Sequence, residues 1–363
     1  MNSSQNSITI SVDALLANYR YLSALQPGIL VAPVLKSNAY GHGLSLVGKI
    51  LDKVNAPFFC LNTIDEAEEL VKNDIKTPLL VMGPVIPQIL KTKKFPFSYA
   101  VYDESFVAAM SNYQPQAGIH IFVDTGMCRE GIPLSDLPEF LRFLQSFKNL
   151  KVEGLMTHLA VGESATLAKN QIKKFEEAKN VVYNAGIIPK WFHQGASGAI
   201  LHNKTFSGKI GNLARVGIAL YGIDPLVRDK KLQPVLQFSS VLTQIKFLHK
   251  GEKVGYDFTY TAPRDMIIGV VPAGYFDGID RRLSNTGYVS VKKKFCPIVG
   301  RISMNFTTID ISTVRDPKVG DPVALYSGNF PDKNSVYCAA QLSGTIPYDI
   351  VAGLPSSTKR VVV

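Results

Sequence analysis

Cysteine is scarce in this sequence of 363 residues, and long apolar runs are missing. The cysteines at 60, 128, 296 and 338 are widely spaced and form no Cys-x-x-Cys pair. This spacing argues against a disulfide framework or a zinc site and suits a reducing compartment. No apolar run approaches the length of a membrane span. The first ten residues carry no basic segment followed by an apolar one, so we expect no signal peptide and a cytoplasmic protein that does not bind membranes.

Acidic residues are also in deficit, because 39 lysines and arginines face 29 aspartates and glutamates, for a formal net charge of +10. The lysines are scattered, with short clusters only at Lys91–Lys94 and Lys292–Lys294, and no basic motif interleaved with aromatic residues accompanies them. The pattern therefore argues against a nucleic-acid partner. A basic surface that helps small anionic ligands arrive is the better interpretation.

Strand-like runs recur eight times in the first 220 or so residues, separated by helical patterns. The runs are Gly28–Leu35, Pro57–Leu61, Pro78–Met82, Phe97–Val101, Gly118–Val123, Val152–Thr157, Trp191–His193 and Leu213–Val216. The helical patterns are clearest at Ile64–Asn73, Leu137–Phe147 and Leu167–Tyr183. Eight strands alternating with helices predict an α/β fold of the (β/α)8 TIM-barrel type. An open doubly wound sheet, the alternative, would normally carry a glycine-rich dinucleotide loop, which is missing.

The pattern changes near residue 232. Val235–Leu248 alternates, Ile267–Val271 and Val289–Val291 are strand-like, and long helical patterns are nearly absent. We therefore predict a barrel domain over residues 1–231 and a mostly β domain over residues 232–363. The junction is expected at Asp224–Pro234, and the first ten or so residues are available to pair with the second domain.

The stretch Val31–Gly43, VAPVLKSNAYGHG, joins a buried strand to a polar loop that contains glycine. Lys36 stands at the carboxyl end of that strand, where barrels present their chemistry. Apolar neighbours would lower its pKa and make its amine nucleophilic enough to form a Schiff base. Tyr40 offers a hydroxyl in the same loop, and Gly41 and Gly43 let the backbone approach a ligand closely. The alternative is a lysine that only reaches from a strand end toward solvent.

A barrel predicts that functional groups follow its strands at their carboxyl ends. Polar candidates follow five strands: Lys36 the first, Asp124–Gly131 the fifth, His158 the sixth, Gly195–Ser197 the seventh, with Arg215 and Gly217 at the eighth. In this fold a phosphate site often forms at the loops after strands seven and eight. Ser197 and the backbone amides of Gly217 and Ile218 suit such a site.

These segments resemble, in order and spacing, the motifs of the alanine racemases, a family that depends on pyridoxal phosphate. The matching segments are Val31–Gly43, Asp124–Gly131 (DTGMCREG), Thr157-His158, Arg215–Gly222 (RVGIALYG), Val254–Tyr260 (VGYDFTY), Gly274–Gly278 (GYFDG), Gly300–Met304 (GRISM) and Ile346–Ile350 (IPYDI). Each motif is weak alone, but together they span essentially the whole chain. The joint order and spacing therefore make the resemblance strong.

The resemblance implies a cofactor site built mostly on the barrel. Lys36 would carry pyridoxal phosphate, and Tyr40 and Tyr348 would bind its phosphate with Ser197. Arg215 would face the pyridine nitrogen, which would then stay unprotonated. Related decarboxylases usually place an acidic residue there, so this arginine argues against that activity. Electron withdrawal by the cofactor would make Cα of a bound amino acid acidic.

The resemblance also implies two acid–base groups on opposite faces of Cα, as racemisation requires. Lys36 would serve one face and Tyr256 the other, with Arg129 binding the substrate carboxylate. A free tyrosine has a pKa of about 10, and cationic or hydrogen-bonding neighbours such as His158 and Arg129 would lower it. In the family the tyrosine comes from the second subunit, so we expect a homodimer with shared active sites.

The expected activity is interconversion of L- and D-alanine, which would supply D-alanine to peptidoglycan. One alternative is a racemase with a broader range of amino acids, such as serine. The other is a carrier that binds pyridoxal phosphate without catalysis. Such carriers are typically a lone barrel, so the second domain argues against it.

Two positions depart from the family pattern. Many members have a carbamylated lysine two residues before the aspartate of DTGM, where it positions the substrate arginine, and this chain has Phe122. The family's Met-Asp is here Met304-Asn305, which removes a negative charge near the substrate carboxylate. Both changes could alter carboxylate affinity or substrate range, and another group must orient Arg129.

Five further residues are assigned smaller roles. Tyr275 and Met304 are expected to line the entrance and the carboxylate pocket from the partner subunit. His42 is expected to order its loop, and His193 to support the wall below Ser197. Asp277 is expected to be structural.

Overall fold

Eight parallel strands of the described residues form a barrel, in the order β2-β10-β9-β8-β6-β5-β4-β3. The computed structural model describes residues 5–203, 211–226 and 229–363. The barrel strands are β2 (Leu30–Pro33), β3 (Phe59–Leu61), β4 (Leu79–Val81), β5 (Ser98–Val101), β6 (Gly118–Asp124), β8 (Lys151–Met156), β9 (Trp191–Gly195) and β10 (Leu213–Val216), and the short β7 (Ile132–Pro133) pairs with β6. A parallel bridge between Val34 and Cys60 links the first two strands and closes the ring. The predicted barrel is confirmed.

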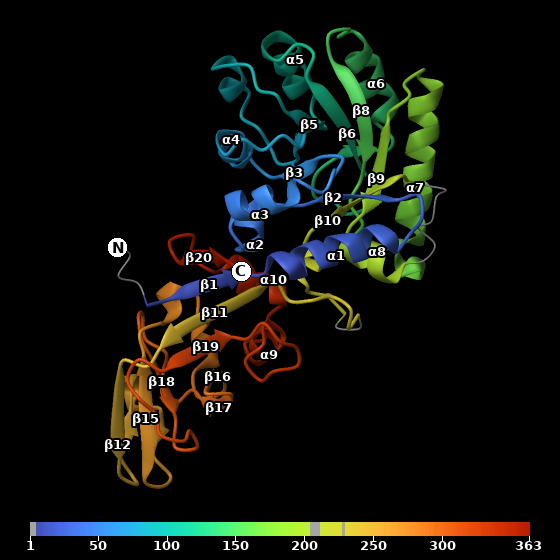
Figure 1. The fold of residues 1–363 in the computed structure, drawn as a ribbon. Helices are drawn as coiled ribbons and strands as arrows, with labels where there is room; N and C mark the ends of the chain where they lie inside the picture. The colour runs from blue at the N-terminus through green and yellow to red at the C-terminus, as the bar shows by residue number, and fades with distance from the viewer. Residues whose placement is uncertain (1–4, 204–210, 227–228) are drawn as a thin grey trace. The chain divides into compact units, whose positions relative to one another are not determined.

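Helices separate the strands and lie outside them (Figure 1). They are α1 (Val12–Ala24), the short α2 (Lys36–Tyr40), α3 (Leu44–Leu51), α4 (Ile64–Lys72), α5 (Glu104–Tyr113), α6 (Leu137–Gln145), α7 (Ala165–Asn184) and α8 (Ser197–His202), with 3-10 turns η1 (Pro87–Lys91) and η3 (Ile218–Tyr221). The central strands are buried throughout, which explains why they read as continuous apolar runs. Helix α6 buries one face only, through Leu137, Phe140, Leu141 and Leu144.

The residues after the barrel form a mostly β unit, as predicted, and most of its strand pairs are antiparallel. The strands are β11 (Leu236–Val241), β12 (Gln244–Leu248), β13 (Lys253–Val254), β14 (Tyr260–Thr261), β15 (Met266–Val271), β16 (Tyr288–Val291), β17 (Lys294–Pro297), β18 (Thr307–Asp310), β19 (Pro322–Tyr326) and β20 (Lys359–Val362). The helical pieces are α9 (Val336–Leu342), α10 (Pro347–Ala352), η4 (Tyr256–Phe258), η5 (Tyr275–Asp277) and η6 (Arg281–Leu283). The N-terminal β1 (Ser7–Ile10) pairs with both β11 and β20.

The alternating run Val235–Leu248 contains two strands rather than one. β11 joins the sheet β17-β16-β19-β11-β1-β20, whereas β12 joins the sheet β12-β15-β18. The change of sheet falls just after Leu242: its amide still donates to Asp321, next to β19, whereas the amide of Thr243 donates to the carbonyl oxygen of Val270 in β15.

The chain divides into two units. One comprises residues 16–39 and 44–232, and the other comprises residues 1–15, 40–43 and 233–363. The short segment Tyr40–Gly43 therefore belongs with the second unit, although the chain on both sides of it belongs to the barrel. Gly41 explains this, because a Cβ there would lie 1.9 Å from the carbonyl oxygen of Val351. The predicted junction Asp224–Pro234 includes residues 227–228, which lie outside the described residues, as do residues 1–4.

Among residues 5–203, 211–226 and 229–363, no helix is long and apolar enough to cross a membrane. The four cysteines fall within these ranges and all are free.

Candidate active site

Lys36 follows β2 at the carboxyl end of the barrel. Burial lowers the pKa of its amine, and the positive charges of Arg129 and Arg215 lower it further. The carboxylates of Glu130 and Glu66 oppose this effect. Lys36 is thus the kind of amine the sequence predicted, with its neutral, nucleophilic form favoured by its surroundings.

The residues after Lys36 adopt an unusual backbone. Ser37, Asn38, Ala39 and Tyr40 all have left-handed φ angles, between 52° and 57°. For residues other than glycine this conformation costs roughly 1–2 kcal/mol each. Two side chains of the barrel unit support the turn: Glu66 accepts from the amide of Ser37 at 2.6 Å, and the oxygen of Asn38 accepts from the amide of Leu44 at 2.8 Å.

Arg215 is the central buried cation of the barrel, at 4% exposure. Nη1 donates to the carbonyl oxygen of His193 at 2.7 Å and contacts Nδ1 of the same residue at 2.9 Å. Nη2 donates to the carbonyl oxygen of Thr157 at 2.7 Å and contacts Nδ1 of His158 at 3.3 Å. Burial and Arg129 lower the pKa of Arg215 to about 10, so it stays protonated near neutrality. The protein bonds described for this side chain leave its Nε–H to donate to a ligand.

His158 is neutral rather than cationic. Burial, Arg215, Arg129 and Lys36 together lower its pKa to about 3. Because a guanidinium can only donate, Nδ1 of His158 must accept from Arg215, and the ring proton sits on Nε2. Of the two neighbours expected to assist the tyrosine, Arg129 alone is positively charged, and His158 can act only through a hydrogen bond.

Asp124 shapes the loop that carries Arg129. Its Oδ1 accepts from the amides of Gly126, Met127 and Cys128 at 2.8–3.1 Å, which folds the chain tightly after β6. The guanidinium of Arg129 then pairs with the neighbouring carboxylate of Glu130. Both side chains are partly exposed, at 50% and 31%.

Phe122, at the position of the family's carbamylated lysine, has no charged or hydrogen-bonding group to offer this ion pair. It packs in an apolar cluster with Ala100 and Met156, against Tyr102 and Met82. The carboxylate that pairs with Arg129 therefore comes from Glu130, the next residue along the chain, rather than from a residue inside the barrel.

Ser197, Gly217 and Ile218 lie together where two helical turns begin. The hydroxyl oxygen of Ser197 accepts from the amides of Gly217 and Ala219, each at 3.2 Å. Ile218 opens η3, and the amide of a first helical residue has no carbonyl partner within its own helix. The hydroxyl and such an amide can both donate to phosphate oxygens.

The other predicted site residues belong to the second unit. Tyr40 and Tyr348 contact each other there, with ring centroids 6.2 Å apart. Tyr256, Tyr275 and Met304 are exposed on neighbouring loops, to 67%, 44% and 54%. The amide of Tyr275 donates to the carbonyl oxygen of Ser303, which holds two of these loops together. Asp277, expected to be structural, accepts from the amide of Gly274 and from Asn6.

The structure thus brings together Lys36, Arg129, His158, Ser197, Arg215, Gly217 and Ile218 within the barrel unit, at the carboxyl ends of its strands. It brings Tyr40 and Tyr348 together within the second unit.

His193 has a different role from the one expected. Instead of supporting Ser197, its ring contacts Nη1 of Arg215 on one side and Nδ1 of His120, at 2.7 Å, on the other. The reason is its place on β9 inside the barrel: the neighbouring strand β10 presents Arg215 to it, and β6, one strand beyond β8, presents His120. His42, in contrast, contacts the carbonyl oxygen of Tyr40 at 2.9 Å, within its own loop.

Sequence reasoning missed Gln171 of α7. Its side chain accepts from the amide of Ala160 at 2.9 Å and donates to the carbonyl oxygen of His158 at 3.1 Å and to Oγ1 of Thr125 at 3.3 Å. It thereby ties together the loops after β6 and β8. A signal was present, because Gln171 is the only polar member of the buried stripe formed by residues 168, 171, 175, 178 and 182 of this helix.

Glu66 was also missed. It belongs to a capping box with Thr63 at the start of α4, and its carboxylate reaches on to the amide of Ser37. The Thr-x-x-Glu spacing could have indicated the helix start but not the second contact.

Two family models match the chain. "Alanine racemase, N-terminal domain" matches residues 10–225, and "Alanine racemase, C-terminal domain" matches residues 235–362. Among curated proteins, the alanine racemase of Lactobacillus acidophilus is 34% identical over 93% of this chain and 92% of its own length. The alanine racemase of Staphylococcus carnosus is 32% identical over 98% of this chain and 94% of its own.

Solved structures agree. The alanine racemase of Bacillus anthracis, solved with bound L-Ala-P, is 29% identical and superposes with a TM-score of 0.91, over 100% of this chain and 96% of that one. The alanine racemase of Clostridium difficile is 26% identical, with a TM-score of 0.92, over 100% and 97%.

Proposed function

The chain belongs to the alanine racemase family, an enzyme family that racemises alanine, and from that premise we propose a two-base reaction on pyridoxal phosphate. Lys36 serves one face of Cα, and Tyr256 of the partner subunit serves the other. The observation that carries the proposal is the buried amine of Lys36, whose pKa is lowered by burial and by two arginines. A lysine whose pKa is lowered in this way can more readily bind an aldehyde and accept a proton.

The residues of the barrel fit pyridoxal phosphate. When bound, this cofactor supplies an electron sink that acidifies the Cα–H of an amino acid. Lys36 would hold its aldehyde carbon, and the hydroxyl of Ser197 with the amide of Ile218 would donate to its phosphate, while the amide of Gly217 orients that hydroxyl. The free Nε–H of Arg215 is a donor suited to a ring nitrogen that carries no proton.

Tyr40 and Tyr348 are two further proposed ligands of the phosphate. Their rings already contact each other, so both hydroxyls belong to one small region of the surface. Tyrosine hydroxyls can donate to phosphate oxygens without adding charge.

Proton transfer at Cα is the proposed task of Lys36 and Tyr256. Nζ of Lys36 takes or returns a proton on its face, because its surroundings favour the uncharged amine. The hydroxyl of Tyr256 does so on the opposite face. His158 remains neutral and keeps its Nε2–H for a hydrogen bond.

Arg129 is also the proposed ligand of the substrate carboxylate, because a guanidinium binds a carboxylate in a planar, bidentate manner. Glu130 holds its Nε and leaves the Nη groups to the substrate. Arg215 would keep the ring nitrogen of the bound cofactor unprotonated. The ring would then withdraw less negative charge from Cα. This favours return of the proton over competing reactions.

The exposed apolar side chains of three neighbouring loops in the second unit support a proposed homodimer. Tyr256, Phe258, Tyr275, Phe276, Met304 and Phe306 are each 44–67% exposed. Contiguous apolar surface of this kind marks a binding face. We propose that a second copy covers it, so that Tyr256, Tyr275 and Met304 enter the partner's barrel and each active site draws on both subunits.

We propose that the enzyme acts in the cytoplasm and supplies D-alanine for peptidoglycan. A broader substrate range is the second candidate, and the replacement of the carbamylated lysine by Phe122, together with Asn305, favours it. Both changes remove negative charge near Arg129 and so bear on how firmly an amino acid is held.

The test is exchange of the Cα proton in D2O by the purified protein with pyridoxal phosphate, followed with chirality on L-alanine, L-serine and larger amino acids. We expect exchange with inversion on alanine, abolished in Lys36→Ala and strongly reduced in Tyr256→Phe. Lys72→Ala and Tyr183→Phe, which change exposed residues of the same types, should match the wild type. Comparable rates on several amino acids would identify a broad racemase, and cofactor binding without any exchange would refute the proposal.

A further inference from the structure

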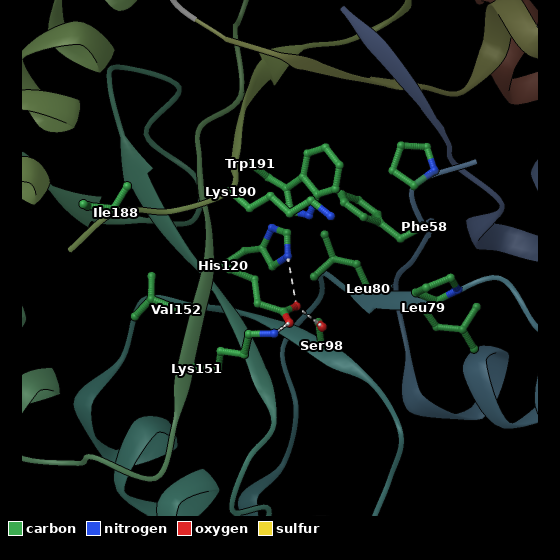
Figure 2. Close-up of a pocket in the computed structure, with 13 residues that line it drawn as sticks. Phe58, Leu79, Leu80, Ser98, His120, Lys151, Val152, Ile188, Lys190 and Trp191 are labelled. Carbon is green, nitrogen blue, oxygen red and sulfur yellow. Dashed lines mark hydrogen bonds and ion pairs between the residues drawn. The ribbon is translucent and has the colours of Figure 1, made fainter. Parts of the chain in front are cut away.

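A cavity of about 320 Å³ lies at the N-terminal mouth of the barrel, at the opposite ends of the strands from Lys36. Its lining includes residues at or just before the first positions of β3, β4, β5, β8 and β9, such as Phe58, Leu79, Ser98, Lys151 and Trp191. In Figure 2, dashed lines join one carboxylate of this cavity to His120, Ser98 and Lys151. That carboxylate is Glu153.

A continuous row of polar groups connects this carboxylate to Arg215. Nη1 of Arg215 lies 2.9 Å from Nδ1 of His193, and Nε2 of His193 lies 2.7 Å from Nδ1 of His120. Nε2 of His120 lies 4.0 Å from Oε2 of Glu153, an ion-pair distance longer than a direct hydrogen bond. The hydroxyl of Ser98 donates to the same oxygen at 2.7 Å and fixes its position.

The chemistry of these groups allows one arrangement of protons. Arg215 has donors only, so Nδ1 of His193 must accept, and a neutral His193 carries its proton on Nε2. That proton is donated to Nδ1 of His120, whose own proton then sits on Nε2 and points to Glu153. Burial and Arg215 lower the pKa of His120 to about 3 and that of His193 well below its usual value, so both rings are neutral.

Two glycines make room for this row. A Cβ at Gly154 would lie 2.2 Å from Nδ1 of His120. A Cβ at Gly118 would lie 2.2 Å from Oε2 of Glu153 and 2.5 Å from Oγ of Ser98. Neither glycine has a left-handed φ, so backbone conformation does not require them. The two glycines instead leave space for the imidazole and for the carboxylate.

We propose that Glu153 is a positioning residue for Arg215, acting across the barrel through His120 and His193. The carboxylate of Glu153 favours a proton on Nε2 of His120. This is the arrangement that Arg215 requires at the other end of the row. Without it, the Nε2 proton of His120 loses its acceptor at this end of the row, so the arrangement that Arg215 requires is held less firmly. The reversed arrangement would turn a ring N–H toward the guanidinium, and Arg215 would lose one of its four contacts.

The inference rests on the proposed role of Arg215 toward the cofactor ring, but its first test does not depend on turnover. Full-length protein labelled with 15N-histidine, with and without pyridoxal phosphate, reports the protonated nitrogen of each ring by NMR. We expect both His120 and His193 to carry their proton on Nε2. A proton on Nδ1 of either ring in the wild-type protein would overturn the proposal, whether or not the protein racemises alanine.

Substitution of Glu153 is the second test. In Glu153→Leu we expect the alternative proton position to appear at His120 and kcat for alanine to fall about tenfold, the lower end of what outer-shell partners contribute. KM should change little, because Arg215 does not bind the substrate carboxylate. Glu153→Gln keeps an acceptor oxygen, so its kcat should fall less than that of Glu153→Leu.

Lys151→Met is the matched control, because Lys151 contacts Glu153 only from the exposed side, at 3.2 Å. It should leave both rings and kcat unchanged. Gly154→Ala, which displaces the ring of His120 without touching the carboxylate, should lower kcat as Glu153→Leu does. Wild-type ring protons and wild-type kcat in Glu153→Leu would refute the positioning role.

Discussion

Replacing Gln171 by leucine should damage the barrel and the reaction together. Gln171 is 7% exposed and makes three hydrogen bonds to the loops after β6 and β8. Ala160 is exposed, so water can replace the bond to its amide. The carbonyl oxygen of His158 and the hydroxyl of Thr125 would lose a donor in a largely buried place, at about 1–3 kcal/mol for each unsatisfied group.

Part of this cost is offset, because leucine is more apolar than glutamine and fills the same place in the buried stripe of α7. We therefore expect a net loss of about 2 kcal/mol, which for a unit of this size lowers Tm by roughly 4–8 °C. The two loops carry Arg129 and His158. Loosening them should lower kcat/KM for alanine by about tenfold or more, because small misplacements of binding groups are costly.

The assay is thermal unfolding by circular dichroism together with racemase kinetics on the same preparations. Asn170→Leu is the matched control, since it makes the same kind of change one residue earlier, on the exposed face of α7. The reasoning would be refuted if Gln171→Leu kept the Tm and the kcat/KM of Asn170→Leu.

Two further predictions concern charged groups of the site. In Glu130→Gln, KM for alanine should rise by at most about fivefold with kcat nearly unchanged, because a partly exposed ion pair contributes about 0.2–1 kcal/mol; steady-state kinetics beside Glu139→Gln checks this, and a large fall in kcat would contradict it. In the cofactor-free protein, Lys36→Met should raise Tm at pH 7, because the lowered pKa of Lys36 means that its cationic form is disfavoured by folding. The gain should be full below the lowered pKa and should fade as pH rises through it toward 10.5, so a gain that is constant over that range in differential scanning calorimetry would contradict the assignment.

The strands of the barrel could be predicted because each contains a short buried run, wholly apolar in β3 and β4, and such runs differ clearly from the one-sided pattern of α6. The same rule failed at Val235–Leu248, because both β11 and β12 alternate and nothing in the alternation marks the change of sheet just after Leu242. Their partners, β1, β19 and β15, are distant in sequence, so the pairing is decided by tertiary structure.

The candidate residues at the strand ends could be identified because barrel geometry gathers them whatever their identity. The partners of those residues could not. His120 and His193 stand 73 positions apart, and their contact depends on the register of β6, β8 and β9. The left-handed turn after Lys36 was likewise invisible, since of Ser37, Asn38 and Ala39 only asparagine readily adopts this conformation and part of the support comes from Glu66, 29 residues away from Ser37.

This distance has a consequence for how the protein is made. The turn after Lys36 is unfavourable on its own, and the carboxylate that holds it is synthesised later, at the start of α4. A nascent chain that has emerged only as far as α3 therefore contains the lysine but cannot keep it in its final setting. The surroundings that lower the pKa of Lys36 are completed later still, because Arg129 and Arg215 follow α4 in the chain.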